Sequence, residues 1–299
     1  MSFERSLDDA SIQALMSTKL FNDYLRDDCQ NGDVFPAIRR NRVDFYYRGG
    51  KLFSWENGKG KGFSTHHKYA SVLCGQDKHY VTESQLKAPT VRLIKDFCEG
   101  YFRIKENCAL YSGLEATGVS ALYHAFSCAN HKKHDVSVLD IEVAFANEDY
   151  SSERSSSDRI DFVTIDVFGK LRFFEAKHYS NRTSLRCDGG VPPLCAQLTK
   201  YDGYLQKFES VILESYVNHV NAIMKLFSVD IPMPKSIDPI TRAIIFGFDN
   251  EQRGYLNKNI IDIKDDAERY PLRHRTYAIG DIAKADLPTI FRGGKQNWD

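Results

Sequence analysis

A single glycine separates two β-forming runs within residues 159–177, and this stretch constrains the fold more than any other part of the sequence. Gly169 suits the left-handed position of a three-residue hairpin loop, so the two runs predict an antiparallel hairpin. A turn centred on Phe168 puts Asp161 opposite Glu175, to within about one residue if a bulge intervenes. Opposed side chains on one face of a hairpin have Cβ atoms roughly 4.5–5.5 Å apart, so we expect the two carboxylates to lie close together.

Charged side chains are unusual in strands as apolar as these. Glu175 and Lys177 are two residues apart and project from the same face, so with Asp161 they bring three ionisable groups among Ile, Val, Leu and Phe. Burying charge is unfavourable unless something compensates for it, and two interpretations remain open. In one, a divalent cation such as Mg²⁺ lies between the carboxylates, while the lysine orients water or stabilises charge on a phosphate. In the other, the lysine neutralises both acids in a partly buried ion-pair network.

The same residues resemble the signature of the PD-(D/E)XK, or restriction-endonuclease-like, nuclease superfamily. That signature has an aspartate on one core strand and acidic–x–Lys on the next, here Asp161 and then Glu-Ala-Lys at 175–177. The RecB-type branch adds Gln-x-x-x-Tyr on a following helix, and Gln197 and Tyr201 have that spacing. One departure is Ile160, which stands where the family often has proline, and the cysteines of iron–sulfur members have no counterpart.

The resemblance implies an α/β fold with a mixed central sheet flanked by helices. It also implies a Mg²⁺-dependent deoxyribonuclease that hydrolyses phosphodiester bonds, with Mn²⁺ as a substitute cation. Asp161 and Glu175 would ligate the metal, with the backbone carbonyl of Ala176 as a further ligand. Lys177 would position or activate water.

Further site residues follow from the same resemblance. Members often begin the core with a helix that contributes an acid, and the predicted helix over 113–129 carries Glu115. Glu142, on the predicted strand that comes next, is the alternative helper, and either residue can be a plain surface acid. Gln197 and Tyr201 share one helix face, so we expect both to line the cleft and contact a phosphate or a metal-bound water.

Basic and aromatic residues interleave over residues 35–68, where eight lysines and arginines are opposed by two acids. Gly49-Gly50 predicts a hairpin turn within this region, and a third strand is expected from Phe63. A surface of this composition can hold phosphates and stack on bases. The alternative is an ordinary small sheet, with aromatic residues on its core face and solvated charges on the other. The residues predicted to contact nucleic acid are Arg39, Arg40, Arg42, Arg48, Lys59 and Lys61.

The change of pattern along the chain predicts two domains with a boundary near Ile104. Residues 1–104 would form an N-terminal α+β module, and residues 105–299 the PD-(D/E)XK-like nuclease domain. Other expected elements are helices over 1–30, 84–105 and 194–227 (broken at Gly203), strands over 136–145 and 243–248, and a polar loop over 151–157.

Composition adds a few exclusions. Forty basic side chains balance forty acidic ones, which argues only against polyanion binding along the whole chain. Seven scattered cysteines without an export signal indicate reduced thiols. No apolar run approaches the roughly 18–20 residues that a membrane span needs, so we expect a cytoplasmic protein with no membrane partner.

DNA is the expected partner. The resemblance also allows a homodimer, because double-strand cleavage in this superfamily often requires one. Family association suggests a role in DNA processing or in antiviral defence against foreign DNA. The alternative is a catalytically inactive restriction-like fold that acts as a nucleic-acid-binding or assembly module.

Overall fold

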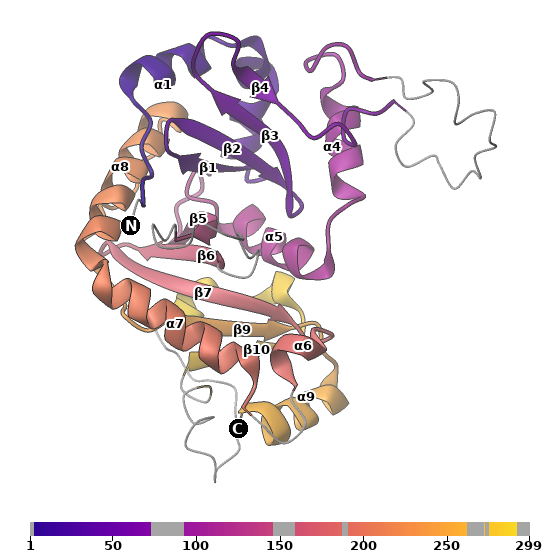
Figure 1. Cartoon of the computed structure of the whole chain (residues 1–299), viewed down its shortest axis with the longest axis vertical. Helices are drawn as coiled ribbons and strands as arrows, with labels where there is room; N and C mark the ends of the chain where they lie inside the picture. The colour runs from indigo at the N-terminus through magenta and orange to yellow at the C-terminus, as the bar shows by residue number, and fades with distance from the viewer. Residues whose placement is uncertain are drawn as a thin grey trace, which may run out of the picture.

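The computed structural model describes residues 3–72, 93–145, 159–186, 191–261, 272 and 275–291. Two β-sheets organise this part of the chain, a small N-terminal sheet at the top of Figure 1 and a larger one below it. The polar loop expected over 151–157, part of the helix expected over 84–105, and Cys74 and Cys187 lie outside the described residues.

The small sheet is antiparallel, with the strand order β1-β2-β3-β4. Its strands are β1 (Phe35–Arg39), β2 (Arg42–Tyr47), β3 (Gly50–Glu56) and β4 (Gly62–Ser64). The turn between β2 and β3 has φ angles of +47° at Arg48 and +84° at Gly49, the left-handed pair that a two-residue hairpin loop of this kind requires. The predicted hairpin and the third strand around Phe63 are therefore confirmed, but the turn residues are Arg48 and Gly49, because Gly50 already pairs with Tyr47 as part of β3.

Short helical segments lie against this sheet. The helix expected over 1–30 is divided into α1 (Asp9–Met16), the π-helical turn η1 (Phe21–Leu25) and α2 (Arg26–Gln30). Asp8 begins α1, because its carboxylate accepts a hydrogen bond of 2.6 Å from the N–H of Ser11. Ser17 follows the end of α1, where its hydroxyl donates to the carbonyl of Ala14 and competes with the helical pattern.

The larger sheet has six strands among the described residues. They are β5 (Val136–Ala144), β6 (Arg159–Asp166), β7 (Lys170–His178), β8 (Ser236–Ile237), β9 (Arg242–Phe246) and β10 (Thr276–Ile279). β5, β6 and β7 pair antiparallel, whereas β9 runs parallel to β7 and β10 runs parallel to β9. The order is β10-β9-β7-β6-β5, with β8 paired to β7, so the sheet is mixed and open.

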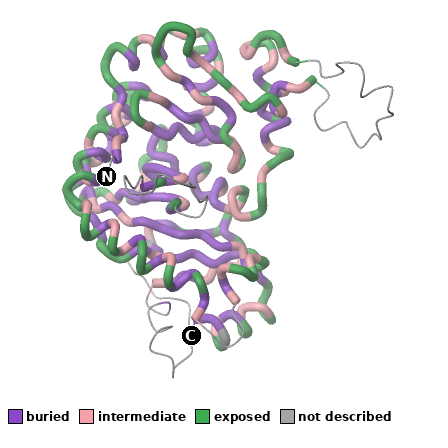
Figure 2. Tube along the Cα trace, in the orientation of Figure 1, coloured by how far each residue is buried: buried purple, intermediate pink, exposed green. Residues whose placement is uncertain are grey.

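Helices cover both faces of the larger sheet. Phe174 and Ile244 pack towards α5 (Leu114–Phe126), η3 (Ile282–Lys284) and α11 (Leu287–Phe291). Their strand neighbours Phe173 and Ile245 pack towards α7 (Pro193–Lys207) and α8 (Glu209–Phe227) on the other face. The strands between these layers are the most continuously buried part of the chain (Figure 2). The predicted α/β fold, a mixed central sheet flanked by helices, is confirmed.

Two helix predictions need correction. In the region expected to be helical over 84–105, the described helix is α4 (Tyr101–Ala109), and Leu93 forms an isolated bridge with Ser71 and is half exposed. The break in the long helix falls at Phe208, where φ is −121° and ψ is 22°, and not at Gly203. Gly203 stays helical, whereas the bend at Phe208 turns α8 from α7 towards α1 and β1.

The remaining helices lie near the C-terminal edge of the larger sheet. They are α6 (Arg182–Leu185), α9 (Asn250–Leu256) and the π-helical turn η2 (Asn257–Ile261). Within the described ranges, no helix has the length and apolar composition to cross a membrane.

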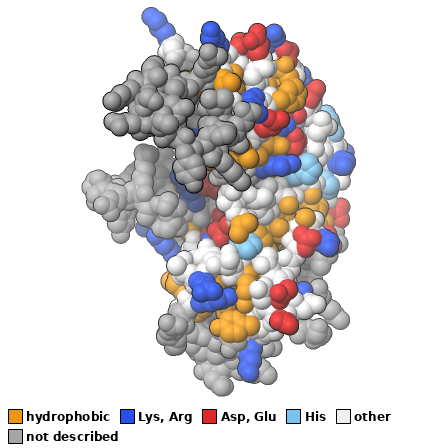
Figure 3. Space-filling model, turned by 90° about the vertical axis from the view of Figure 1, so that its right-hand side faces the viewer, with side chains coloured by type: hydrophobic (Ala, Val, Ile, Leu, Met, Phe, Trp, Pro, Cys, Tyr) orange, Lys and Arg blue, Asp and Glu red, His pale blue; other side chains and the backbone are white. Residues whose placement is uncertain are grey.

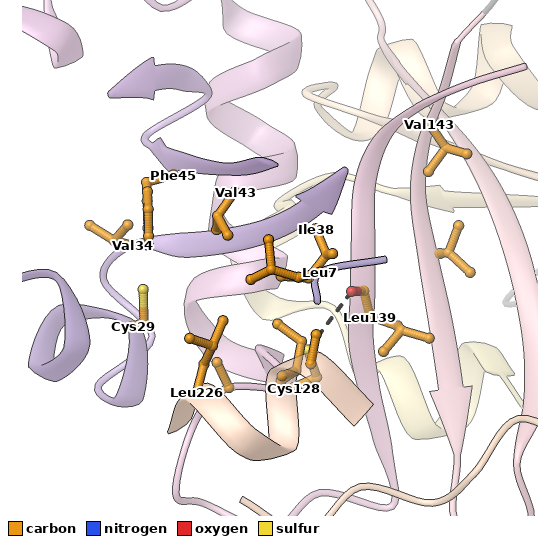
Figure 4. Packing of buried hydrophobic residues seen from close by; sticks show 14 of the residues in the cluster. Leu7, Cys29, Val34, Ile38, Val43, Phe45, Cys128, Leu139, Val143 and Leu226 are labelled. Atoms are coloured by element: carbon orange, nitrogen blue, oxygen red, sulfur yellow. Dashed lines mark hydrogen bonds between the residues drawn. The ribbon is translucent and has the colours of Figure 1, made fainter. Parts of the chain in front are cut away.

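The hydrophobic core does not divide at the predicted domain boundary. Ile104 lies inside α4 and is fully buried. Figure 4 shows Phe45 and Ile38 of the small sheet in one cluster with Leu139 of the larger sheet and Leu226 of α8. The two sheets therefore share a core, and a linker near residue 104 is not what separates them.

Candidate active site

The β6–β7 hairpin has the register that the sequence predicts. Its pairs run from Ile165 with Leu171 to Phe162 with Phe174, and Gly169 in the turn has a φ of +81°. The same register puts Asp161 and Glu175 at the next opposed positions. The ladder ends before them, so the two strands part where the charged residues lie.

At this point the side chain of Asp161 continues the hydrogen bonding between β6 and β7. Its Oδ2 accepts a hydrogen bond of 2.6 Å from the backbone N–H of Ala176, so a side chain replaces a main-chain partner between the two strands. The N–H is the group that Ala176 directs towards Asp161, and its carbonyl as a metal ligand stays a prediction.

Glu175 and Lys177 lie side by side, as their spacing predicts. The ammonium of Lys177 donates to Glu175 Oε1, and it also lies 3.3 Å from Oε1 of Glu115 on α5. Glu175 and Lys177 are 1% and 6% exposed, whereas the Glu115 side chain is 31% exposed. The ammonium therefore pairs with the carboxylates of Glu175 and Glu115, and the nearby carboxylate of Asp161 adds to the negative charge around it.

This excess of negative charge changes the acidity of the cluster. Burial, together with the neighbouring Glu175 carboxylate, raises the pKa of Asp161 well above its usual range. Burial also raises the pKa of Glu175 to about 7, although Lys177 acts in the opposite direction. Burial alone would lower the pKa of Lys177, but the carboxylates outweigh it and raise that pKa, so the lysine stays protonated.

Glu115 is held in the cluster from two sides. Its Oε2 accepts hydrogen bonds from the backbone N–H of His178 at 3.2 Å and from Nδ2 of Asn181 at 3.1 Å. Asn181 also begins α6, because its Oδ1 accepts from the N–H of Ser184. Nothing in the local sequence indicates that Asn181 contacts Glu115, because the two residues lie 66 positions apart.

Glu142, the alternative helper, also faces this region. It has a φ of +51° inside β5, a left-handed conformation that is strained for a glutamate and is concentrated at functional sites in proteins. Its carboxylate lies 3.3 Å from Nη1 of Arg159, and within the described ranges it forms no ion pair with Lys177. Glu115 therefore joins the charged cluster directly, while Glu142 stands at its border.

Gln197 connects the cluster to α7. Its Nε2 donates to Glu175 Oε1 at 2.8 Å and to the hydroxyl oxygen of Tyr201 at 2.9 Å. The Tyr201 hydroxyl in turn donates to the backbone carbonyl of Arg159 at 2.8 Å. This chain of bonds ties the start of β6 to Glu175.

The expected role of Tyr201 in contacting a phosphate needs correction. Tyr201 is fully buried among apolar residues of the α7 face, with its hydroxyl turned to main chain. It positions Gln197 and does not line the cleft.

A hollow of about 220 Å³ opens beside Asp161. Glu115 of α5 and Glu142 of β5 line one side of it, and Tyr46 and Gly49 line it from the small sheet. A Cβ on Gly49 would lie 2.6 Å from Ala116 of α5, so the β2–β3 turn is pressed directly against the helix that carries Glu115. The charged cluster is thus not sealed, and the small sheet supplies one wall of its opening.

A larger hollow of about 700 Å³ lies at the opposite end of β6, beside Val167 and Lys235. It is separated from Asp161 by nearly the whole strand, so it does not belong to the charged cluster.

One observation favours a metal ion in this charged cluster, and another argues against a preformed metal site. Glu175 Oε2 is buried and finds no hydrogen-bond partner among the described residues, which leaves an oxygen ready for a hard cation. On the other side, no group of three or more His, Cys, Asp or Glu side chains in the described ranges is already gathered as a metal site. The donor types fit Mg²⁺, but Lys177 now occupies the space between Glu175 and Glu115.

Arg39 lies in the interior, which contradicts the prediction that it contacts nucleic acid. Its Nη1 lies 2.7 Å from Asp140 Oδ1, and its Nη2 donates to the carbonyl of Ile141 at 2.7 Å. The side chain is only 11% exposed, and Asp140 is fully buried.

The other predicted cations lie at the surface, at two ends of the small sheet. Arg42 pairs with Glu56 in the register at one end, and Tyr47 pairs with Gly50 at the other. Arg40, Lys59 and Lys61 lie in the loops at the Arg42 end, where Arg40 pairs with Glu4, Arg42 with Asp44 and Lys61 with Glu56. Arg48, stacked 5.5 Å from the Tyr47 ring, is the predicted cation at the end that borders the hollow. Figure 3 shows that basic and acidic side chains are interspersed on another view of the surface, in keeping with the net charge of zero.

No protein-family model, curated protein or solved structure matches this chain.

Proposed function

We propose that this protein is a metal-dependent nuclease that hydrolyses phosphodiester bonds of DNA. The observation that carries the proposal is the buried oxygen of Glu175 without a hydrogen-bond partner, in a cluster of three carboxylates and one ammonium beside an open hollow. A protein gains no stability from carboxylates whose pKa values are raised by burial and mutual repulsion, which favours a functional reason for them.

Asp161 and Glu175 would hold Mg²⁺, with Mn²⁺ as a substitute and Glu115 as the nearest further carboxylate. When bound, the cation would neutralise the excess negative charge, lower the pKa of a bound water and stabilise the leaving oxygen.

Lys177 acts in this proposal as a charged donor. Its raised pKa keeps it protonated at neutral pH, so it does not accept a proton from water in this state. Its ammonium, held by Glu175 and Glu115, can orient a water or a phosphate oxygen by hydrogen bonds and stabilise charge that develops there.

Gln197 and Tyr201 contribute by positioning. Gln197 fixes Glu175 Oε1, and Tyr201 fixes Gln197 against the main chain of β6. Preorganisation of this kind matters, because a carboxylate misplaced by about 1 Å can reduce a rate by about 100-fold.

The wider setting rests on the resemblance to PD-(D/E)XK nucleases. We extend the proposal to a cytoplasmic enzyme of DNA processing or antiviral defence, which acts as a homodimer where it cuts both strands.

A cleavage assay with the purified full chain tests the proposal. Linear, circular and single-stranded DNA are incubated with Mg²⁺, Mn²⁺ or EDTA, and products are resolved by electrophoresis. We expect cleavage only with a cation, and Lys177→Ala should reduce its rate by about 100-fold or more. The matched control is Lys132→Ala, an exposed lysine beside the remote hollow, which should cleave like the wild type. Full activity in Lys177→Ala would overturn the assignment.

A second candidate is the catalytically inactive fold that binds nucleic acid or supports assembly. It is favoured by Lys177 already bonding to Glu175, with no preassembled metal group among the described side chains. Binding of DNA without cleavage in either cation would select this candidate.

A further inference from the structure

Aromatic and cationic side chains gather on the loop that follows β4 and on the link between α4 and α5. The rings of His66 and His67 have centroids 4.6 Å apart, and those of His66 and Tyr69 are 5.7 Å apart. Tyr69 and Tyr111 are 6.0 Å apart, and the ammonium of Lys68 lies 4.5 Å from the Tyr111 ring and 5.1 Å from the Tyr69 ring. We call these five residues the aromatic platform.

The platform combines a fixed base with accessible rings. Tyr69 is buried, its N–H donates to the carbonyl of His66 at 2.8 Å, and its own carbonyl accepts from Nδ2 of Asn107 at 2.7 Å. His66 and His67 are exposed, and Tyr111 is 49% exposed. A set of exposed rings on a rigid base is organised to receive another flat ring without losing much conformational entropy.

Two platform residues lie near residues that line the hollow beside Asp161, although none of the five platform residues lines it directly. Tyr111 stands two residues before Gly113, which lines the hollow. The Tyr69 hydroxyl lies 3.3 Å from where a Cβ on Gly50 would be, and the preceding Gly49 also lines the hollow. Arg48, in the same turn, adds a further exposed cation.

The chemistry of this group matches an unpaired nucleotide. Aromatic rings interleaved with cations stack on bases of any sequence and attract the phosphates between them. A base inside a duplex is already stacked on its neighbours and cannot offer its face to a protein ring. The hollow has a volume of about 220 Å³, below the roughly 300–1,000 Å³ of complete small-molecule sites, so it suits part of one nucleotide better than a base pair.

We propose that the aromatic platform binds unpaired nucleotides beside the charged cluster, so that the substrate is single-stranded DNA or the unpaired end of a duplex. This inference rests on the proposed nuclease function for its substrate, while the binding itself can be measured without cleavage.

The test is fluorescence anisotropy with a labelled oligothymidylate of about 20 nucleotides and a duplex of the same length, in EDTA to prevent hydrolysis. We expect the wild type to bind the single strand at least about tenfold more tightly than the duplex. Tyr111→Ala should weaken single-strand binding by about tenfold, Lys68→Ala by a smaller factor, and Tyr111→Phe should bind like the wild type.

Phe168→Ala is the matched control, because Phe168 is a 77% exposed aromatic residue in the β6–β7 turn at the far end of β6. It should leave both affinities unchanged, and far-ultraviolet circular dichroism checks that each variant is folded. Equal affinity for single strand and duplex, or unchanged single-strand affinity in folded Tyr111→Ala, would overturn the inference.

The two proposals fail separately. If Tyr111-dependent binding is found but no DNA is cut in Mg²⁺ or Mn²⁺, the platform stands and the nuclease function falls. If DNA is cut in a Lys177-dependent way but Tyr111→Ala affects neither binding nor the preference for single strands, the nuclease function stands and the platform falls.

Discussion

Two carboxylates on neighbouring strands of the larger sheet, the buried Asp140 and the partly buried Asp161, have opposite surroundings. Asp140 on β5 lies 2.9 Å from Arg5 Nε and 2.7 Å from Arg39 Nη1, and accepts a hydrogen bond from the Tyr216 hydroxyl at 3.3 Å. Burial alone would raise the pKa of Asp140, but the two arginines outweigh it and lower that pKa to about 2.

Asp161 on β6 forms no ion pair among the described residues, because the nearby Lys177 pairs with Glu175 and Glu115, and the pKa of Asp161 is raised. The difference separates two uses of buried charge. The Asp140 cluster satisfies its charge inside the protein and joins the N-terminal segment, β1, β5 and α8. The Asp161 cluster leaves negative charge uncompensated next to an opening, as expected if the proposed cation binds there.

Removing the carboxylate from the compensated cluster should have the larger effect on stability. We expect Asp140→Ala to lower the free energy of unfolding by about 3–5 kcal/mol, because two buried arginines lose their partner. Urea denaturation followed by circular dichroism measures this change. Asp230→Ala, at an exposed aspartate, is the control and should shift the value by less than about 0.5 kcal/mol. A loss below about 1 kcal/mol in Asp140→Ala would remove the distinction between the two clusters.

Glu175→Gln should act in the opposite direction. The pKa of Glu175 is about 7 in the folded protein and 4.5 ordinarily, so from pH 4.5 to 7 the unfolded chain ionises first and the stability of the wild type falls as pH rises. Glutamine has no such slope. We therefore expect the variant, in EDTA, to be more stable than the wild type at pH 8 by on the order of 1–3 kcal/mol, and about equal to it at pH 4.

Thermal unfolding across this pH range measures the effect of Glu175→Gln. Mg²⁺ should then raise the melting temperature of the wild type and leave the variant nearly unchanged. A variant less stable than the wild type at pH 8 would instead support a purely structural ion-pair network around Lys177.

Tyr201→Phe should have the smallest effect. It removes one buried hydroxyl from the chain that connects Arg159, Gln197 and Glu175, so we expect a loss of about 1 kcal/mol in stability. The rate of DNA cleavage should fall by less than about tenfold with KM unchanged, since Tyr201 acts through Gln197. A loss of activity as large as that in Lys177→Ala would mean that Tyr201 contacts the substrate.

The sequence predicts the local features of the site well. Alternation around Gly169 is sufficient for the β6–β7 register, because both partners of a hairpin lie within the same short stretch. The spacing of Glu175 and Lys177 likewise predicts that they are neighbours. The position of Glu115 follows only from the resemblance.

The sequence does not reveal which acids are neutralised, because this depends on partners that are distant along the chain. Asp140 stands between Leu139 and Ile141 much as Asp161 stands between Ile160 and Phe162, so the local pattern cannot tell which acid is neutralised. The answer lies with Arg5 and Arg39, which come 135 and 101 positions earlier. Arg39 looks like a surface cation because its partner Asp140 is distant in the sequence. Ile104 looks like a domain boundary because the core that buries it is built from distant parts of the chain.

The tight contact between Gly49 and Ala116 has one more consequence. Because the turn and the helix touch backbone to backbone, a tilt of the small sheet cannot be absorbed by flexible side chains and must shift the helix that carries Glu115. The N-terminal third of the chain is therefore part of the frame that sets the width of the hollow beside Asp161, and a fragment trimmed to the larger sheet would lose one side of it.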